Sequence, residues 1–524
     1  MPSLHRLLLL LCLLAWTPLA AAQTNFRVTL PDDAPEGGWT GRLVVYTIAD
    51  NSGMRRADPS DGPFWQNPQP LFGVDVRGEP GGAVVEVPAT TAFPNTYPFP
   101  PAELPAGEYR AQAVLDVSRL DSAWQREPGN RYGEAVAFNV EPDSPVAVEL
   151  SLANETEGFA FPEVEGVTEV VVESKLLSDF HGQPVFLRAG VVEPIDFDEN
   201  KKYAAIYEVP GFGGRHDGAV GDVRRTSGDR GELRKRAFMI TLDPESPNGH
   251  TLFCDSAVNG PYATALIEEL IPAIEAKYPS LVNEAWARII TGHSSGGWSS
   301  LWLGTQYPET FGATWSSAPD PVDFRRFERI DIYSDANAYV KDGEEQPSCR
   351  YFNDAGEMEV TLSVRGENGG EGVLTPDEAS GQQWDSWMAC WGTPDESNPR
   401  VAGKPWPVAK PLFDAKTGEL DHAEAEHYKQ FDIRLLLAND PDRYLPVFSN
   451  NIRLACGTLD NYYLNEAVEL LKAEVESHGR EGGVGYITMV DGADHGGSLF
   501  RSEAMGAWPR EMIAHLDEHL QVDE

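Results

Sequence analysis

Basic residues are scarce in this sequence. The 524 residues include 41 lysines and arginines against 82 aspartates and glutamates, which gives a formal net charge of −41. Nucleic acids and anionic membranes attract positively charged surfaces, so a balance this acidic disfavours both as partners. A solvated acidic surface accounts for the charge, whether it reflects a saline habitat or solubility alone. The sequence leaves the oligomeric state open.

Long apolar runs are also rare. The pronounced one, "LLLLLCLLAW", follows His5 and Arg6 and precedes three alanines that end at Ala22. This order is typical of a secretory signal, so we expect residues 1–22 to be a signal peptide cleaved near Ala22 and the protein to be secreted or periplasmic. Cys12 lies inside the leucine run, which disfavours a lipoprotein. No later stretch reaches the ~20 apolar residues of a membrane helix, so we expect no membrane insertion.

Cysteine is the third scarce residue. Outside the predicted signal peptide the chain has four, none in a CxxC pair: Cys254, Cys349, Cys390 and Cys456. This spacing disfavours a zinc or redox site, and the sequence indicates neither a metal nor an organic cofactor. In an oxidising compartment four cysteines favour two disulfides, with three connectivities to choose from. We predict the pairs Cys349–Cys390 and Cys254–Cys456.

The chain is too long for one ordinary domain, so we expect at least two. Residues 23–152 contain short stretches with alternating or β-branched apolar residues, such as "RLVVYTIA" and "EYRAQAVLDV", between Gly, Pro and Asp clusters. This rhythm predicts an all-β, sandwich-like N-terminal domain of about seven strands. Residues 153–167 then read as a linker.

Residues 168–524 show a different pattern of predicted secondary structure. Buried strands such as "YAAIYEV", "AFMITLD" and "WARIITG" alternate with helices, which predicts an α/β domain with a predominantly parallel sheet. Residues 321–450 interrupt this alternation, and because connections this long have structure of their own or act as lids, we expect a large cap insertion. It contains four tryptophans that either contact a bulky substrate or form the insertion's own core: Trp384, Trp387, Trp391 and Trp406.

A serine stands between glycines in Gly292-His293-Ser294-Ser295-Gly296. The strand "WARIITG" precedes it, and "GGWSSLWLGTQY" after it is compatible with a helix. A sharp strand-to-helix turn is the setting of a nucleophile elbow, where flanking side chains larger than hydrogen would clash. We therefore predict that Ser294 is a catalytic nucleophile.

An acid and a histidine follow at strand ends. His495 comes after the strand in "YITMVDGADHGGS", and Asp460 comes after the strand in "NIRLACGTLDNYY". The order Ser294, Asp460, His495 is that of the α/β-hydrolase triad. Asp320, which follows the strand in "ATWSSAP", meets the same positional rule and is the alternative acid.

A glycine-rich loop, Gly211-Phe212-Gly213-Gly214, follows the strand "YAAIYEV". Such a loop can provide one backbone N–H of an oxyanion hole, and the residue after the nucleophile provides the other. We predict Phe212 and Ser295 as the two donors. The loop lacks the Walker lysine and the Rossmann spacing, so a phosphate-binding role is disfavoured.

From about Thr168 onward the chain resembles the esterase D family of α/β-hydrolases, which includes feruloyl esterases and S-formylglutathione hydrolases. The resemblance is carried by "YEVPGFGG", "ELIPAIEAKYP", "TGHSSGGWSSLWLGTQYPETFGA" and "GADHGG". It implies an α/β-hydrolase fold, here with a large cap insertion and after the all-β domain, and a Ser-His-Asp triad. The family usually has His-Gly where this chain has Pro210-Gly211.

These features predict an exported serine esterase that hydrolyses carboxylic esters. The expected partner is a small-molecule or carbohydrate-linked ester. A serine peptidase or an acyltransferase would use the same triad, and a non-catalytic binding protein could retain the same scaffold.

Overall fold

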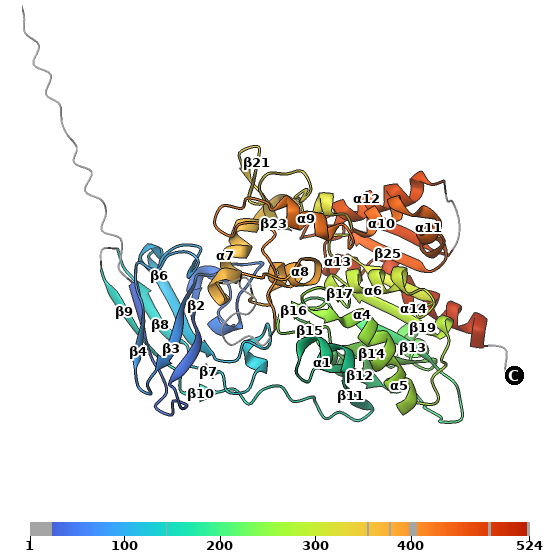
Figure 1. Cartoon of the computed structure of the whole chain (residues 1–524), viewed down its shortest axis with the longest axis horizontal. Coiled ribbons are helices and arrows are strands. Elements are labelled where there is room, and N and C mark those ends of the chain that lie inside the picture. The colour runs from blue at the N-terminus through green and yellow to red at the C-terminus, as the bar shows by residue number, and fades with distance from the viewer. Residues whose placement is uncertain are drawn as a thin grey trace, which may run out of the picture.

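The computed structural model describes residues 24–142, 144–353, 356–376, 379–397, 406–479 and 484–520. The predicted signal peptide lies outside these ranges. A β-rich N-terminal domain stands beside a larger α/β domain in which helices surround a sheet (Figure 1). Within the described ranges, no helix combines the length and the apolar character that crossing a membrane requires.

Within the described residues, the N-terminal domain has ten strands, where the sequence predicts about seven. They are β1 (Thr24–Thr29), β2 (Trp39–Ala49), β3 (Leu71–Glu79), β4 (Val84–Val87), β5 (Thr96–Tyr97), β6 (Gly107–Asp116), β7 (Arg131–Tyr132), β8 (Val136–Val140), β9 (Val146–Ser151) and β10 (Asn154–Glu155). One sheet has the order β4-β1-β9. The other has the order β10-β7-β6-β2-β3-β5, with β8 paired to β6.

Strand β2 is buried on both faces. Leu43 and Val45 belong to the apolar core that the domain's two sheets share. Val44 and Tyr46 point the other way, into a cluster that includes Val373 of the α/β domain. Because side chains alternate between the faces of a strand, the apolar run in β2 reflects two separate packing layers. The second layer attaches the N-terminal domain to the rest of the chain.

The α/β domain is built on one eight-stranded sheet of order β11-β12-β14-β13-β19-β20-β25-β26. Its strands are β11 (Val167–Glu173), β12 (Phe186–Val192), β13 (Ala204–Val209), β14 (Ala237–Leu242), β19 (Arg288–His293), β20 (Ala313–Ser317), β25 (Ile452–Gly457) and β26 (Tyr486–Val490). The pairs β11–β12 and β12–β14 are antiparallel, and all the others are parallel. The predominantly parallel sheet predicted from the sequence is therefore confirmed.

Helices cover both faces of this sheet. On β13, Ile206 packs in a cluster with Trp508 of α14, whereas Tyr207 packs in one with Leu266. The helices around the sheet are α1 (Lys175–His181), α2 (Ala219–Val223), α3 (Gly228–Leu233), α4 (Tyr262–Ala265), α5 (Ile271–Lys277), α6 (Ser295–Gln306), α12 (Leu464–Ser477), α13 (Gly497–Phe500) and α14 (Glu503–Leu520). Four two-residue strands, β15 (Glu245–Ser246), β16 (Gly249–His250), β17 (Asp255–Ser256) and β18 (Gly260–Pro261), form two small hairpins.

The helical segment over residues 262–277 contains a defect. A π-helical turn over Leu266–Leu270 separates α4 from α5. Pro272 follows directly and has no N–H to donate to the preceding turn. The chain therefore changes its hydrogen-bonding pattern at this point instead of forming one regular helix.

The segment 321–450 lies between β20 and β25, and most of its buried apolar side chains belong to the same core cluster as those of α6, β25 and α12. It contains β21 (Val340–Lys341), β22 (Glu344–Glu345), β23 (Pro347–Phe352), β24 (Met358–Ser363), α7 (Val364–Leu374), α8 (Gln383–Trp391), α9 (His422–Tyr428), α10 (Ile433–Asn439) and α11 (Pro441–Asn450). Figure 1 shows α7 and α8 between the N-terminal domain and the sheet of the α/β domain.

Both predicted disulfides are wrong for this structure, in which all four described cysteines are free and buried. Cys456 lies inside strand β25 and Cys349 lies in the hairpin of the insertion. Cys254 instead contacts the backbone of Cys390, with its Sγ 3.7 Å from the carbonyl oxygen. The predicted pairs fail because the fold places Cys254 next to Cys390, a neighbour that spacing along the chain does not reveal.

Candidate active site

Ser294 occupies a sharp turn between β19 and α6. Its backbone angles are φ 60° and ψ −125°, a conformation that an L-residue adopts only under strain. The glycines around it leave no room for a side chain: a Cβ at Gly292 would lie 2.0 Å from the Gly296 oxygen, and one at Gly296 would lie 1.9 Å from the Val209 oxygen. The sequence pattern G-x-S-x-G therefore follows from packing against β13.

A hydrogen-bond chain links the three residues predicted as a triad. His495 Nε2 lies 3.1 Å from Ser294 Oγ, and His495 Nδ1 lies 2.7 Å from Asp460 Oδ2. With Nδ1–H donating to the carboxylate, Nε2 is free to accept the serine proton. The structure thus brings Ser294, His495 and Asp460 together in a geometry suited to nucleophilic catalysis.

Backbone contacts fix the acid and the histidine. Asp460 Oδ1 accepts hydrogen bonds from the N–H groups of Tyr462, at 2.9 Å, and Leu464, at 3.3 Å. The His495 N–H donates to Asn461 Oδ1 at 3.0 Å. The Tyr462 ring stands edge-on to the imidazole of His495, with ring centroids 4.9 Å apart. These contacts hold both side chains in place before a substrate arrives.

The pKa values of the neighbouring His495 and His293 are shifted in opposite directions. Burial lowers the pKa of His495, but the charge and hydrogen bond of Asp460 outweigh it, so that pKa is raised above its usual value. His293 has no such partner, and burial together with His495 lowers its pKa to about 3. His293 is therefore neutral near pH 7, with Nδ1 3.0 Å from Ser317 Oγ. Only His495 is placed to exchange a proton with Ser294.

Asp320, the alternative acid, has other partners. Its Oδ2 accepts from Trp387 Nε1 at 2.7 Å and from Gln383 Nε2 at 3.4 Å. Burial raises the pKa of Asp320 to about 6, although its hydrogen bonds and the nearby His495 oppose this. His495 Nδ1 bonds to Asp460 instead, so the geometry favours Asp460 over Asp320 as the orienting acid.

The predicted oxyanion loop lies directly against the nucleophile. A Cβ at Gly211 would lie 3.0 Å from the His293 oxygen and 3.3 Å from Ser294 Cβ, so the loop backbone approaches Ser294 closely. Phe212 lines the cavity at Ser294, and Ser295 is the first residue of α6. A helix N-terminus favours negative charge, so Phe212 and Ser295 flank the place where an oxyanion would form.

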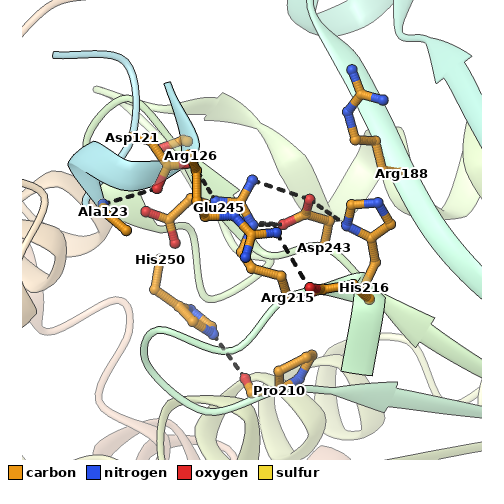
Figure 2. Close-up of polar contacts among 12 residues, drawn as sticks. Asp121, Ala123, Arg126, Arg188, Pro210, Arg215, His216, Asp243, Glu245 and His250 are labelled. Atoms are coloured by element: carbon orange, nitrogen blue, oxygen red, sulfur yellow. Dashed lines mark hydrogen bonds and ion pairs between the residues drawn. The ribbon is translucent and has the colours of Figure 1, made fainter. Parts of the chain in front are cut away.

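A residue that the sequence analysis missed, His250, holds this loop. Its Nε2–H donates to the Pro210 oxygen at 3.0 Å (Figure 2). Its Nδ1 accepts from the Leu252 N–H at 3.0 Å. Burial lowers the pKa of His250 to about 4, so the ring is neutral and its tautomer is set by these two contacts. Only the assembled fold reveals this role, since the motif around His250 carries no signal.

An ion-pair network beside the loop joins the two domains. Arg215 pairs with Asp243 at 2.8 Å and with Asp121 of the N-terminal domain at 2.5 Å (Figure 2). His216 Nδ1 lies 2.7 Å from the same Asp243 carboxylate. The Ser122 N–H donates to Glu245 Oε1 at 3.2 Å. These contacts attach the N-terminal domain to Arg215, which directly follows the loop at Gly211–Gly214, and to Glu245.

The site opens into a cavity of about 270 Å³. Its lining comes from the N-terminal domain, the oxyanion loop, the elbow and the insertion: Trp65, Gly211, Phe212, His293, Ser294, Asp320, Glu328, Glu367, Gln383, Trp387, Tyr462, Leu464 and His495. Of the four tryptophans singled out in the insertion, Trp387 alone is in this lining. Trp384 and Trp391 are fully buried in the apolar cluster that the insertion shares with α6, and Trp406 stacks on His181. Among the described residues, no group of three or more His, Cys, Asp or Glu side chains could hold a metal ion.

One protein-family model matches the central region of the chain. Residues 189–435 match the model described as "Putative esterase". The resemblance drawn from the sequence motifs is confirmed at that level. The match includes Ser294 but ends before Asp460 and His495. No curated protein matches the chain.

Three hydrolases are among the solved structures that match the chain. A ferulic acid esterase is 13% identical, with 67% of this chain and 98% of that chain covered and a TM-score of 0.38. FphF, a fluorophosphonate-binding serine hydrolase from Staphylococcus aureus, is 11% identical, with 67% and 98% covered and a TM-score of 0.36. An S-formylglutathione hydrolase from Agrobacterium tumefaciens is 13% identical, with 68% and 97% covered and a TM-score of 0.36.

Proposed function

We propose that this protein is a serine esterase that hydrolyses carboxylic esters through an acyl-enzyme. The observation that carries the proposal is the hydrogen-bond chain from Asp460 through His495 to Ser294, which lies in a strained elbow and lines a cavity. The match of residues 189–435 to the model described as "Putative esterase" supports the same class of reaction.

In the acylation step, Ser294 Oγ attacks the ester carbonyl carbon while His495 Nε2 takes the hydroxyl proton. Asp460 stabilises the imidazolium that forms and keeps Nδ1–H pointing toward its carboxylate. The carbonyl oxygen becomes an oxyanion between the N–H groups of Phe212 and Ser295. The intermediate collapses when the C–O bond to the alcohol breaks and His495 gives its proton to the leaving oxygen.

Deacylation repeats these steps with water. His495 removes a proton from a water molecule, whose oxygen attacks the acyl carbon. The bond to Ser294 Oγ then breaks, the serine recovers a proton from His495, and the carboxylic acid leaves. No group other than the side chains and amides named here is required.

Turnover of p-nitrophenyl acetate by the Ser294→Ala variant tests this proposal. We expect kcat to fall by at least about 10³-fold without loss of folding, because the nucleophile is gone. Ser300→Ala is a matched control in the same helix, since its hydroxyl bonds to the Gly297 oxygen and lies outside the cavity. Near-normal turnover by Ser294→Ala would refute the esterase mechanism.

The same assay separates the competing functions. A serine peptidase would cleave a p-nitroanilide at a rate comparable to that of the ester. An acyltransferase would give more transfer product than acid when a sugar or another alcohol is added. A binding protein on this scaffold would turn over none of these substrates.

We also propose that the protein is exported. The support comes from the sequence alone. His5 and Arg6 precede an apolar run, and three alanines that end at Ala22 provide a cleavage site. Expression with this segment and N-terminal sequencing of the product is the test, with a new terminus near Gln23 expected. Protein that stays in the cytoplasm with an intact first residue would contradict it.

A further inference from the structure

Three carboxyl groups line the cavity at Ser294, and the triad uses none of them. Asp320 follows strand β20, Glu328 lies in the first part of the insertion, and Glu367 comes from helix α7. The lining within the described chain includes two histidines but neither a lysine nor an arginine. The described cavity wall therefore carries three acidic groups outside the triad without a lysine or arginine to balance them.

The three carboxyls differ in how well they are partnered. Asp320 accepts from Trp387 and Gln383, and Glu367 Oε2 accepts from Trp384 Nε1 at 3.1 Å. Glu328 is only 1% exposed, yet its Oε2 has no hydrogen-bond partner in the described chain. A buried carboxyl oxygen without a partner is costly, so Glu328 is the group that a ligand would satisfy.

One serine serves both glutamates. Ser348 Oγ lies 3.3 Å from Glu328 Oε1 and also contacts Glu367 Oε2. A hydroxyl has a single hydrogen, so it can donate to only one of the two carboxylates. The negative charge of this pair of glutamates is compensated only when one carboxyl keeps a proton or when a cation lies beside the pair.

The directions in which the pKa values of Glu328 and Glu367 are shifted agree with this geometry. Burial raises the pKa of Glu328 well above its usual value, and the charges of Glu367, Asp320 and Glu371 raise it further. Burial also raises the pKa of Glu367, against its bonds from Ser348 and Trp384. The negative charges of the neighbouring carboxyl groups that favour a proton on Glu328 also favour a positive charge beside it.

We infer that this cavity binds a positively charged group of the substrate, a primary ammonium that donates to Glu328 Oε2 and sits in the field of Glu367 and Asp320. The inference rests on the proposed function, because the ester carbonyl must lie at Ser294 for the ammonium to reach this wall. An ammonium has three N–H donors and can therefore bridge the unpartnered oxygen and a second carboxylate.

The rest of the lining suits the same ligand. Trp65, Trp387, Phe212 and Tyr462 give the cavity an aromatic character. Aromatic rings attract cations as well as alkyl chains, so a flexible alkylammonium matches both the acidic and the apolar parts of the wall. The ammonium can be carried on the acid or on the alcohol of the ester, and the experiment below distinguishes the two.

Two matched pairs of esters test the inference. Methyl ε-aminohexanoate differs from methyl heptanoate only by an ammonium in place of a methyl group on the acid, and ω-aminohexyl acetate differs from heptyl acetate likewise on the alcohol. We expect kcat/KM for the charged member of one pair to exceed its neutral partner by about 10-fold or more, since charge-assisted hydrogen bonds are strong. The pair that shows the preference identifies the side of the ester that carries the charge.

The Glu328→Gln variant removes the charge but keeps the shape. In this variant we expect the charged-to-neutral ratio to fall to about one, and Glu367→Gln should lower it if Glu328→Gln does not fold. Glu344→Gln, which changes an exposed carboxyl elsewhere in the insertion, should keep the wild-type ratio. Equal rates for both members of both pairs in the wild type, or an unchanged ratio in Glu328→Gln, would overturn the inference.

Calorimetry with n-hexylammonium and n-hexanol gives a readout that needs no turnover. We expect the ammonium to bind the wild type at least about 10-fold more tightly than the alcohol, and Glu328→Gln to lose this difference. If the ammonium binds in this way but Ser294 has no activity, the proposed function fails and the cation site stands. If the protein turns over esters but shows no preference for the ammonium, the proposed function stands and the cation site fails.

Discussion

The indole of Trp65 lies directly against Gly370 of helix α7, where a Cβ would stand 2.7 Å from the ring atom Cζ3. Two other glycines of α7 face Tyr97, whose Oη and Cδ2 would lie 3.2 Å and 3.4 Å from a Cβ at Gly366 and Gly369. Glycine is unfavourable inside a helix, so the presence of these three glycines in α7 is explained by their packing against the aromatic rings. It allows two aromatic residues of the N-terminal domain to approach the helix and places Trp65 in the lining of the cavity at Ser294.

Substitution of Gly370 by alanine should disturb that contact. The ring of Trp65 has to move, and overpacking of this kind costs about 1–3 kcal/mol of the free energy of unfolding. We expect kcat/KM to fall as well, because Trp65 lines the cavity. Gly506→Ala is the control: Gly506 is an exposed residue of α14 with nothing within 4 Å of its Cβ position, so the same change should stabilise by roughly 1 kcal/mol or less. Urea unfolding and ester kinetics measure both effects, and a fully active, more stable Gly370→Ala protein would disprove the contact.

The two candidate acids should respond differently to amide substitution. Asp460→Asn removes the acceptor that holds the His495 tautomer, and we expect kcat to fall by about 10⁴-fold. Asp320→Asn keeps the Asp460–His495 bond and should cost far less. The comparison uses kcat for p-nitrophenyl acetate in folded variants. A larger loss in Asp320→Asn would reverse the assignment.

The pH profile should report the charge of Asp320 on His495. Catalysis needs the neutral imidazole, so kcat/KM falls as the pH drops through the pKa of His495, which Asp460 and Asp320 hold above its usual value despite burial. Replacement of Asp320 by asparagine removes a negative charge that favours the imidazolium, so the pKa of His495 should fall and the acidic limb should move to lower pH. An acidic limb that stays in place or moves to higher pH would contradict the coupling.

His250 should act through the oxyanion loop. Its Nε2–H fixes the Pro210 carbonyl, and loss of that bond lets the Phe212 N–H drift from the oxyanion. Since small displacements of catalytic groups cost up to about 10²-fold, we expect His250→Ala to lower kcat by about 10–100-fold with a smaller change in KM. His181→Ala is the control, because His181 is also buried and contacts a carbonyl, that of Asn259, away from the triad. Comparable kcat losses in both variants would assign His250 to general stability.

Local sequence patterns were sufficient for the sheet and for the three residues that the structure brings together. A strand such as β13 has apolar residues on both faces, with Ile206 and Tyr207 in different clusters, so it stands out as an apolar run. Parallel strands end at the same edge of a sheet, which is why residues just after three of them, Ser294, Asp460 and His495, meet.

Contacts between distant segments could not be predicted in this way. Trp65 enters the cavity from another domain, and Glu328 faces it from an irregular part of the insertion, so neither belongs to a repeating pattern. The cysteine pairs were wrong for the same reason, because the neighbour of Cys254 depends on how α8 packs on the hairpins before α4. The insertion's tryptophans divide between core and cavity according to burial, which composition does not encode.

Covalent labelling with a fluorophosphonate, followed by peptide mapping, tests the central claim most directly. A phosphonate reacts with a serine that an adjacent histidine activates, and the strained elbow exposes Ser294 Oγ to the cavity. We predict one adduct per chain, located on Ser294, and no adduct in Ser294→Ala. An unlabelled wild-type protein, or a label on a different serine that persists in Ser294→Ala, would contradict the account.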